Sequence, residues 1–291
     1  MKGEPVAPAS LGALLAELAA GLDRAQVPLA HDEARDIVAA VLDVPRFWPV
    51  TNREALVDST AVDEARTAAA ARARGAPFAY AVGRAAFRYL TLAVDHRVLI
   101  PRQETEVLVD LVLQAQAGGR GTAIDVGTGS GAIALALATE GTFERVVGTD
   151  VSLDALAVAE RNAAFLRDAL VAPVDFVHGS LLAPVRGMRA SVVVSNPPYI
   201  AFAELGELPP SVRDWEPPLA LVSADQGLAA TRAIIREART VLEVGGLLAL
   251  EVDSRRASLV AEAAASDGSY DDISVHLDLT GRERFVLARR R

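Results

Sequence analysis

Two stretches of the sequence carry side chains that could take part in chemistry. The first is Asn196-Pro197-Pro198-Tyr199, which Ser195 separates from the run 191–194, rich in β-branched residues. Such a run is typical of a buried strand, and the two prolines end it because proline has no N–H to donate to a sheet. The pattern therefore places a carboxamide at the carboxyl end of a central strand, where open α/β sheets bind their ligands.

This arrangement could hold a planar –NH2 group. The carbonyl oxygens of Asn196 and Pro197 are acceptors for its two N–H donors, and Tyr199 would form an aromatic wall beside it. Holding both donors would direct the nitrogen toward an electrophile. A strand-ending turn without function explains the four residues about equally well, so a second motif is needed to decide.

The second motif is the glycine-rich stretch Asp125-Val126-Gly127-Thr128-Gly129-Ser130-Gly131, which lies between an apolar run and a predicted helix. Glycines here allow positive φ angles and close approach of the backbone to a ligand. The spacing G-x-G-x-G differs from the G-x-G-x-x-G of dinucleotide-binding proteins, so no pyrophosphate site is required. Asp150 ends the next predicted strand, where a carboxylate can accept both hydroxyls of a ribose. The joint spacing favours ligand binding over a tight turn and a helix cap.

Together these motifs resemble those of class I S-adenosylmethionine-dependent methyltransferases that act on planar amino groups, and in particular the HemK-type (PrmC) release-factor glutamine methyltransferases. The resemblance extends over nearly the whole chain. Further stretches that carry it are 98–106, 150–152, 155–157, Glu216-Pro217, Ala220-Leu221 and Gly281-Arg282-Glu283-Arg284.

The resemblance implies an α/β fold: a seven-stranded Rossmann-like methyltransferase domain behind a small helical bundle and a β-hairpin linker. It implies methyl transfer from S-adenosylmethionine, giving S-adenosylhomocysteine, to the side-chain nitrogen of the glutamine in the Gly-Gly-Gln motif of class I peptide-chain release factors. The residues expected to bind the cofactor are Asp125, Gly127, Thr128, Gly129, Ser130, Gly131, Asp150, Ser180, Leu181 and Asn196. Those expected to bind the substrate are Asn196, Pro197, Pro198 and Tyr199, of which Asn196, Pro197 and Tyr199 are the expected catalytic residues. No general base is assigned.

Three alternatives stay open on the sequence alone. The same grip on an amine suits an adenine-N6 or cytosine-N4 nucleic-acid methyltransferase acting on a flipped base. A glutamine methyltransferase of a ribosomal protein and a non-catalytic protein-binding relative are the others. The net charge of −9 argues against direct nucleic-acid binding, which depends on neutralising phosphates with Lys and Arg.

Composition limits the other kinds of site. The chain has no cysteine, and its four histidines (His31, His96, His178 and His276) lack ligand spacing, so no metal is expected. Residues 1–5 do not resemble a signal peptide, and no apolar run approaches the ~20 residues of a membrane span. We therefore expect a cytoplasmic protein that does not bind membranes, and a monomer.

The elements that must position the motifs divide the chain into three expected parts. Residues 1–77 show helical spacing of apolar residues and predict a substrate-positioning bundle, 78–100 a β-hairpin linker, and 101–291 the methyltransferase domain. Strands and helices alternate in the last part, which predicts a parallel sheet covered on both faces. The predicted strands are 122–126, 145–149, 174–177, 191–194, 247–252, 273–277 and 284–288, and the predicted helices are 11–22, 31–42, 62–74, 104–116, 132–139, 153–166 and 229–242.

Overall fold

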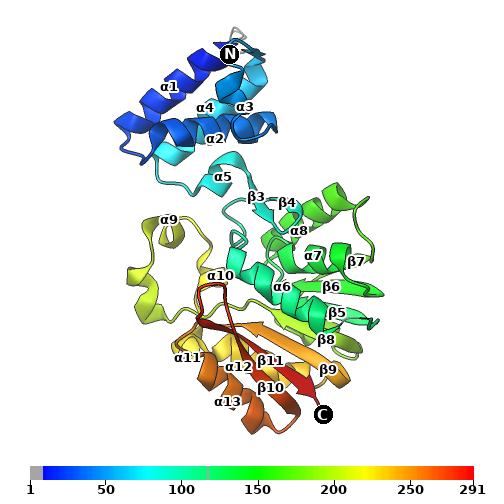
Figure 1. Cartoon of the computed structure of the whole chain (residues 1–291). Helices are drawn as coiled ribbons and strands as arrows, with labels where there is room; N and C mark the ends of the chain where they lie inside the picture. The colour runs from blue at the N-terminus through cyan, green and yellow to red at the C-terminus, as the bar shows by residue number, and fades with distance from the viewer. Residues whose placement is uncertain (1–8, 117) are drawn as a thin grey trace. The chain divides into compact units, whose positions relative to one another are not determined.

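The computed structural model describes residues 9–116 and 118–291 (Figure 1). Residues 1–8, where the sequence predicted no signal peptide, and residue 117 lie outside the described residues. The chain divides into two compact units, Met1–Gly83 with Pro210–Trp215 and Arg84–Pro209 with Glu216–Arg291. Among the described residues, no helix combines the length and the apolar character needed to cross a membrane.

The first unit is mainly helical. Its helices are α1 (Leu11–Arg24), α2 (Ala30–Leu42), α3 (Trp48–Thr51), α4 (Ser59–Ala73), α5 (Phe78–Val82) and α9 (Pro210–Arg213), and β1 (Ala9–Ser10) pairs antiparallel with β2 (Leu56–Val57). Helices α1, α2 and α4 pack as a bundle. The apolar stripe of α1 is buried in a core shared with α2 and α4. The side chain of Ser10 caps α1 by accepting a hydrogen bond from the Ala13 N–H, and Asp58 caps α4 in the same way. The predicted N-terminal helices are confirmed.

The second unit is built on a seven-stranded sheet, as predicted. Its strands are β5 (Thr122–Val126), β6 (Arg145–Asp150), β7 (Val174–His178), β8 (Ala190–Ser195), β9 (Leu242–Glu251), β10 (Tyr270–Leu277) and β11 (Glu283–Arg290). Their order across the sheet is β10-β11-β9-β8-β5-β6-β7. The chain proceeds outward in opposite directions from β5 and from β8, so the carboxyl ends of these two strands form the switch point at which α/β sheets bind ligands.

The expectation of a wholly parallel sheet is wrong at one edge. Strand β11 pairs antiparallel with both β9 and β10, whereas the other neighbours are parallel. The turn between β10 and β11 is only residues 278–282, far shorter than the crossover that parallel strands need. Asp278 holds this turn by accepting hydrogen bonds from the backbone N–H groups of Thr280 (2.8 Å) and Arg282 (3.0 Å).

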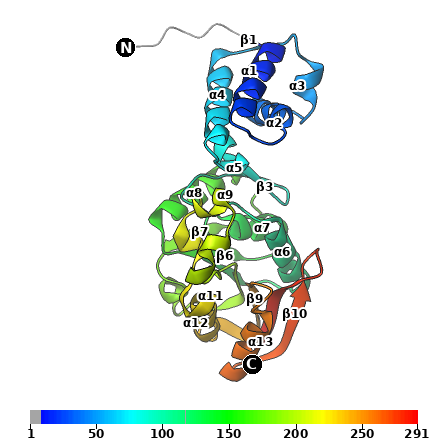
Figure 2. The same ribbon diagram turned by 90° about the vertical axis from the view of Figure 1, so that its left-hand side faces the viewer.

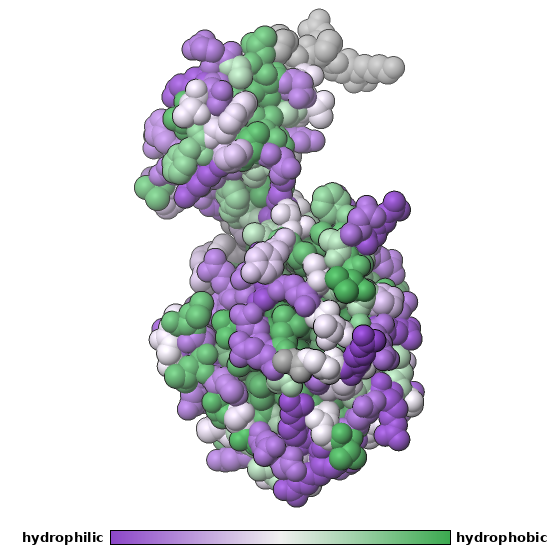
Figure 3. Space-filling view, turned by 45° about the vertical axis from the view of Figure 1, so that its right-hand side comes forward, coloured by the Kyte–Doolittle hydropathy of each residue, from purple (hydrophilic) through white to green (hydrophobic). Residues whose placement is uncertain are grey.

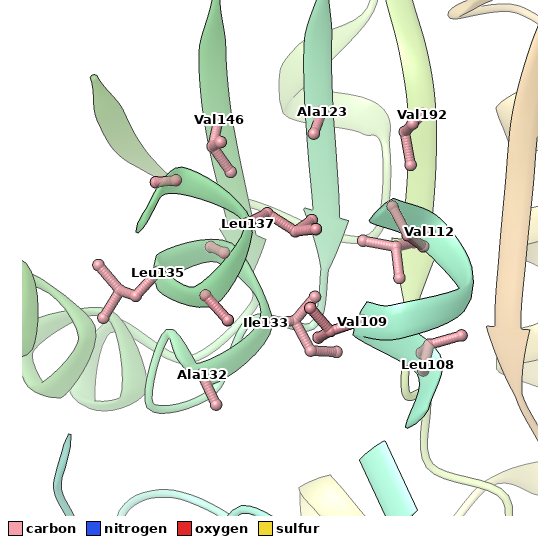
Figure 4. Close-up of a cluster of buried hydrophobic side chains, with 14 of the residues drawn as sticks. Leu108, Val109, Val112, Ala123, Ala132, Ile133, Leu135, Leu137, Val146 and Val192 are labelled. Atoms are coloured by element: carbon pink, nitrogen blue, oxygen red, sulfur yellow. The ribbon is translucent and has the colours of Figure 1, made fainter. Parts of the chain in front are cut away.

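Helices cover both faces of the sheet. They are α6 (Gln103–Ala115), α7 (Ala132–Glu140), α8 (Leu153–Leu166), α12 (Ala229–Ala238) and α13 (Ala257–Asp267). Successive strand residues face opposite sides. Val192 of β8 therefore packs with α6 and α7 (Figure 4), Val194 belongs to the same buried cluster, and Val193 packs with α12 and α13. Helices α12 and α13 lie side by side (Figure 2).

Short helical turns occupy several connections. They are η1 (Ala183–Val185), η2 (Phe202–Glu207), α10 (Pro218–Leu221) and α11 (Ala224–Gly227). On the face shown in Figure 3, hydrophobic and hydrophilic residues are interspersed, as is usual for a protein surface, much of which is apolar.

The hairpin expected over residues 78–100 is shorter than that range. It consists of β3 (Arg84–Phe87) and β4 (Leu90–Ala93), paired antiparallel. Residues 78–82 form α5, which begins after Pro77 and ends at Gly83 with a φ of 70°. The run 97–100 is not a strand, because its chain bonds elsewhere: the Ile100 N–H donates to Glu216 Oε2 (3.3 Å).

Arg88 joins the tip of this hairpin to α6 and α7. Its guanidinium donates two hydrogen bonds of 2.7 Å to the Glu140 carboxylate and one of 2.9 Å to the Glu106 carbonyl, and it lies 2.8 Å from Asp110 Oδ1. The bond to Glu140 raises the pKa of Arg88 above its usual range. The side chains of Arg88 and Glu140 are 10% and 16% exposed, so this ion pair is largely desolvated.

We expect Arg88→Ala to lower the free energy of unfolding by roughly 3 kcal/mol, because it leaves Glu140 partly buried without its cation. The matched control is Arg145→Ala, which breaks an exposed pair with Asp175 in the same unit and should cost no more than about 1 kcal/mol. Urea unfolding followed by circular dichroism measures both. Equal losses in the two variants would contradict a special role for Arg88.

Candidate active site

A cavity of ≈ 370 Å³ lies in the second unit, and residues at the carboxyl ends of β6 and β8 are among those that line it. Seven of the residues predicted from the sequence to form a site line this cavity: Gly127, Gly129, Asp150, Ser180, Leu181, Asn196 and Pro198. The fold therefore brings the two motifs to one place, although they are far apart in the sequence.

The glycine loop borders the cavity with backbone alone. Gly127 and Gly129 have φ angles of 72° and 55°, and a Cβ added at either would meet no atom within 4 Å. A side chain at these positions would be strained and would enter the space that a ligand needs. Gly131 differs, since a Cβ there would lie 3.1 Å from Leu135 and 3.2 Å from Phe176. Glycine at this position therefore allows Leu135 and Phe176 to pack closely against the loop.

Asp150 is held in place by two backbone N–H groups. Its Oδ2 accepts a hydrogen bond from Gly129 N (2.9 Å), and its Oδ1 accepts one from Ser152 N (2.9 Å). A carboxylate has about four lone-pair sites, so these bonds leave acceptor capacity on both oxygens. The group is thus oriented at the cavity before any ligand binds, and it could accept two vicinal hydroxyls.

Asp125, Thr128 and Ser130 are buried and do not line the cavity. Asp125 Oδ2 accepts hydrogen bonds from Thr128 Oγ1 (2.6 Å) and from Ala134 N (3.2 Å), so it fixes the loop to the start of α7. Its Oδ1 is buried and has no hydrogen-bond partner among the described residues. Burial raises the pKa of Asp125 to about 7.

Asn162 also supports the loop, and the sequence analysis missed it. This buried residue of α8 donates from Nδ2 to the carbonyls of Ser130 (2.9 Å) and Ala93 (3.0 Å), and its Oδ1 accepts from Ala93 N (2.7 Å). It therefore connects the glycine loop to β4. An asparagine among apolar residues in a predicted helix was the available signal, since buried carboxamides are rarely left without partners.

The Asn-Pro-Pro-Tyr stretch is only partly at the cavity. Asn196 and Pro198 line it, whereas Pro197 is buried and neither Pro197 nor Tyr199 contributes to the lining. Burial, with the nearby Glu251 charge, raises the pKa of Tyr199 above its ordinary value. Ser195, just before Asn196, donates to the Val126 carbonyl (2.7 Å) and so fastens the end of β8 to the end of β5.

The sequence did not predict a role for the other residues that line the cavity. They are Arg97, Val98, Leu99, Val151, Ser152, Ala155, Pro217, Leu219, Ala220 and Ala230. Most of these come from stretches that carried the family resemblance without an assigned role. The buried carboxylate of Glu216 joins two of these stretches, because it accepts hydrogen bonds from Arg102 Nη2 (2.7 Å) and Ile100 N (3.3 Å).

The site fits a nucleoside-containing ligand with a positive charge. Open glycine backbone and the pre-oriented carboxylate of Asp150 line the same cavity, and the carboxyl of Asp125 is buried beside the glycine loop. No cluster of three or more His, Cys, Asp or Glu residues that could hold a metal occurs within residues 9–116 and 118–291.

Comparison with known proteins gives matches along most of the chain. Residues 103–206 match the family model of the methyltransferase small domain, and residues 13–83 match that of the PrmC N-terminal domain. The release factor glutamine methyltransferase of Deinococcus radiodurans is 37% identical over 95% of this chain and 97% of its own. That of Nitratidesulfovibrio vulgaris is 34% identical over 97% and 96%.

Solved structures agree with the fold. The hMettl16 catalytic domain, in complex with the MAT2A 3'UTR hairpin 1, matches with a TM-score of 0.57 at 16% identity, over 88% of this chain and 91% of that one. At this identity the likeness shows the fold alone.

The raised pKa of Asp125 gives a stability prediction. Because the carboxyl binds its proton more tightly in the folded state, it stabilises the fold at low pH, and that stabilisation is lost as the pH rises from about 4 through about 7. The carboxamide in Asp125→Asn cannot titrate, so the unfolding free energy of this variant minus that of the wild type should rise by about 2–3 kcal/mol between pH 5 and pH 8. Urea unfolding at both pH values measures it. A difference that does not change with pH would show that Asp125 is not the desolvated acid described here.

Proposed function

The chain belongs to the release factor glutamine methyltransferase family, and from this premise we propose that it methylates the side-chain amide nitrogen of the glutamine in the Gly-Gly-Gln motif of class I peptide-chain release factors, with S-adenosylmethionine as methyl donor. The resemblance seen in the sequence is confirmed by relatives that match nearly the whole chain. The observation that carries the proposal is that Asn196 shares one cavity with Gly129 and Asp150.

The glycine loop and Asp150 support this proposal at the end of the cavity that would bind the cofactor. S-adenosylmethionine supplies a methyl group on a positively charged, electrophilic sulfur. Asp150 would accept the ribose hydroxyls, and Gly127 and Gly129 would allow the ligand to lie against the loop. Asp125 would hold that loop in place through its bonds to Thr128 and Ala134. Ser180 and Leu181 line the cavity and would contact the adenine end.

At the substrate end, the reaction depends more on how the amide nitrogen is placed than on proton transfer. An amide nitrogen is a poor nucleophile because its lone pair is delocalised into the carbonyl. Asn196 Oδ1 and the Pro197 carbonyl would each accept one N–H of the substrate amide, which aims the nitrogen and favours the positive charge that it acquires during attack. Tyr199 would limit the space beside it.

The rest of the molecule takes its role from this chemistry. Residues 1–77 would position the release factor, residues 78–100 would link the two domains, and residues 101–291 would carry out catalysis. The enzyme in this proposal is a monomer. It works in the cytoplasm, where translation ends, and binds neither nucleic acid nor membrane directly.

Asp150→Ala should weaken binding of S-adenosylmethionine by roughly 1.5–3 kcal/mol, the range for losing charge-assisted hydrogen bonds. Isothermal titration calorimetry measures the dissociation constant. Asp168→Ala, an exposed carboxylate of the same unit, is the matched control and should leave it unchanged. An unaltered dissociation constant in folded Asp150→Ala would remove Asp150 from the site.

Asn196→Ala should lower turnover on a purified release factor by about 10²-fold, by analogy with the loss of one preorganised polar group in other enzymes. The fold and the cofactor affinity should change little, because the side chain is aimed at the substrate. The assay is mass spectrometry of the Gly-Gly-Gln peptide after incubation with labelled cofactor.

The same assay separates the alternative functions. A release factor with Gln→Ala in Gly-Gly-Gln should take up no label, and neither should ribosomal proteins, DNA or RNA. Methylation of one of these in place of the release factor would overturn the proposed substrate. Wild-type turnover by Asn196→Ala would remove Asn196 from the catalytic centre.

A further inference from the structure

The carboxamide of Asn196 is bonded on one side to a buried pair of side chains. Asn196 Nδ2 donates to Thr105 Oγ1 (3.0 Å), and Thr105 Oγ1 donates to Glu251 Oε2 (2.6 Å). Thr105 lies in the first turn of α6, and Glu251 is the last residue of β9. They are 4% and 1% exposed, so water cannot easily replace either bond.

The direction of these bonds is set by the acid. In its ionised form Glu251 has no proton to donate, so the single hydroxyl proton of Thr105 then points to Glu251. The Thr105 oxygen then has only lone pairs left, and the group that it faces must be a donor. Of the two ends of the Asn196 carboxamide, only the NH2 end satisfies this requirement.

The oxygen end is thereby turned away from Thr105. Asn196 lines the cavity, while Thr105 does not, so the bond on Nδ2 leaves Oδ1 for a group within the cavity. An unrestrained carboxamide can present either end, and its NH2 end would repel the N–H donors of a substrate amide. Fixing the orientation in advance removes that wrong state.

Burying a carboxylate is an energetically unfavourable way to hold α6 against β9. Desolvation of Glu251 is only partly compensated, since the charges of Arg102 and Arg284 stabilise its carboxylate while the charge of Glu104 opposes it. An apolar or neutral residue would pack here at lower cost. The acid is explained if its strict acceptor character is needed.

We propose that Thr105 and Glu251 are positioning residues that fix the Asn196 carboxamide with its oxygen toward the substrate amide. This inference rests on the proposed function for the identity of the substrate. The arrangement itself is a property of the three side chains, and it can be tested without turnover.

The first test is Glu251→Gln, which preserves shape and removes the charge. The new NH2 group can donate to Thr105, whose proton then points to Asn196 and turns the carboxamide around. Turnover on the release factor should fall by about 10²-fold, with the KM for the release factor and the dissociation constant for S-adenosylmethionine changed by less than about threefold. Glu243→Gln, an exposed acid on the same strand, is the matched control and should retain wild-type turnover.

The second test concerns the hydroxyl. Thr105→Val removes both hydrogen bonds and should lower turnover as much as Glu251→Gln does, whereas Thr105→Ser restores the hydroxyl and should recover most of the rate. In an Asn196→Ala background, Glu251→Gln should have no further effect, because nothing is left to orient. A full additional loss in that background, or no rescue by serine, would show that the pair only holds α6 against β9.

The third test needs no activity and separates failure of the inference from failure of the proposed function. In the wild type, nuclear Overhauser contacts should join the Asn196 side-chain NH2 protons to the Thr105 methyl group, and Glu251→Gln should abolish them. Contacts that persist in Glu251→Gln, or that are missing in the wild type, overturn the orientation. If the contacts behave as expected but the release factor is not methylated, the substrate is wrong and the orientation stands.

Discussion

The parallel pairing of β5 with β8 is the constraint on which the site depends. Asp125 lies opposite Val194 in this ladder, so both strands end at the same level, one before the glycine loop and the other before Asn196. The Ser195 hydroxyl adds a bond to the Val126 carbonyl where the ladder stops. Burial of alternate valines against helices on the two faces fixes this register, because a slip by one residue would turn every apolar side chain to the other face. Packing far below the cavity thus determines which side chains meet in it.

Several buried polar groups beneath the cavity cost stability, and each one holds a segment that the sheet alone would leave free. Asp125 fixes the glycine loop to α7, Asn162 fixes the same loop to β4, and Glu251 fixes Thr105. Burial raises the pKa of both Asp125 and Glu251 to about 7, because it disfavours their charged forms in the folded state. Such concentrations of perturbed acids are typical of functional sites, where precise placement is favoured over stability.

Much of the fold followed from local sequence signals. The strand 122–126 and the helix 153–166 have the predicted bounds, because a β-branched run and a capped apolar stripe are each unambiguous. Helix α13 was missed since its alanine-rich sequence has little periodicity, and α12 ends at Ala238 because Leu242 already pairs in β9. The motifs predicted which loops form the site. They could not predict that Pro197 and Tyr199 lie off the cavity wall or that Asn196 bonds to Thr105, since such contacts depend on side-chain directions between elements far apart in sequence.

The proposed cofactor end and the proposed substrate end of the cavity are built in different ways. The cofactor end is made by strand ends, glycine backbone and two N–H groups on Asp150, so it needs few particular side chains. The substrate end is made by side-chain bonds between distant stretches, with Glu216 joining Arg102 to the wall and Thr105 joining Asn196 to β9. Those bonds require particular residues at several positions at once. The stretches 98–106 and 216–221 supply Arg102, Thr105 and Glu216 to these bonds, so the proposed substrate end depends on side chains that lie at least 91 residues apart in the sequence.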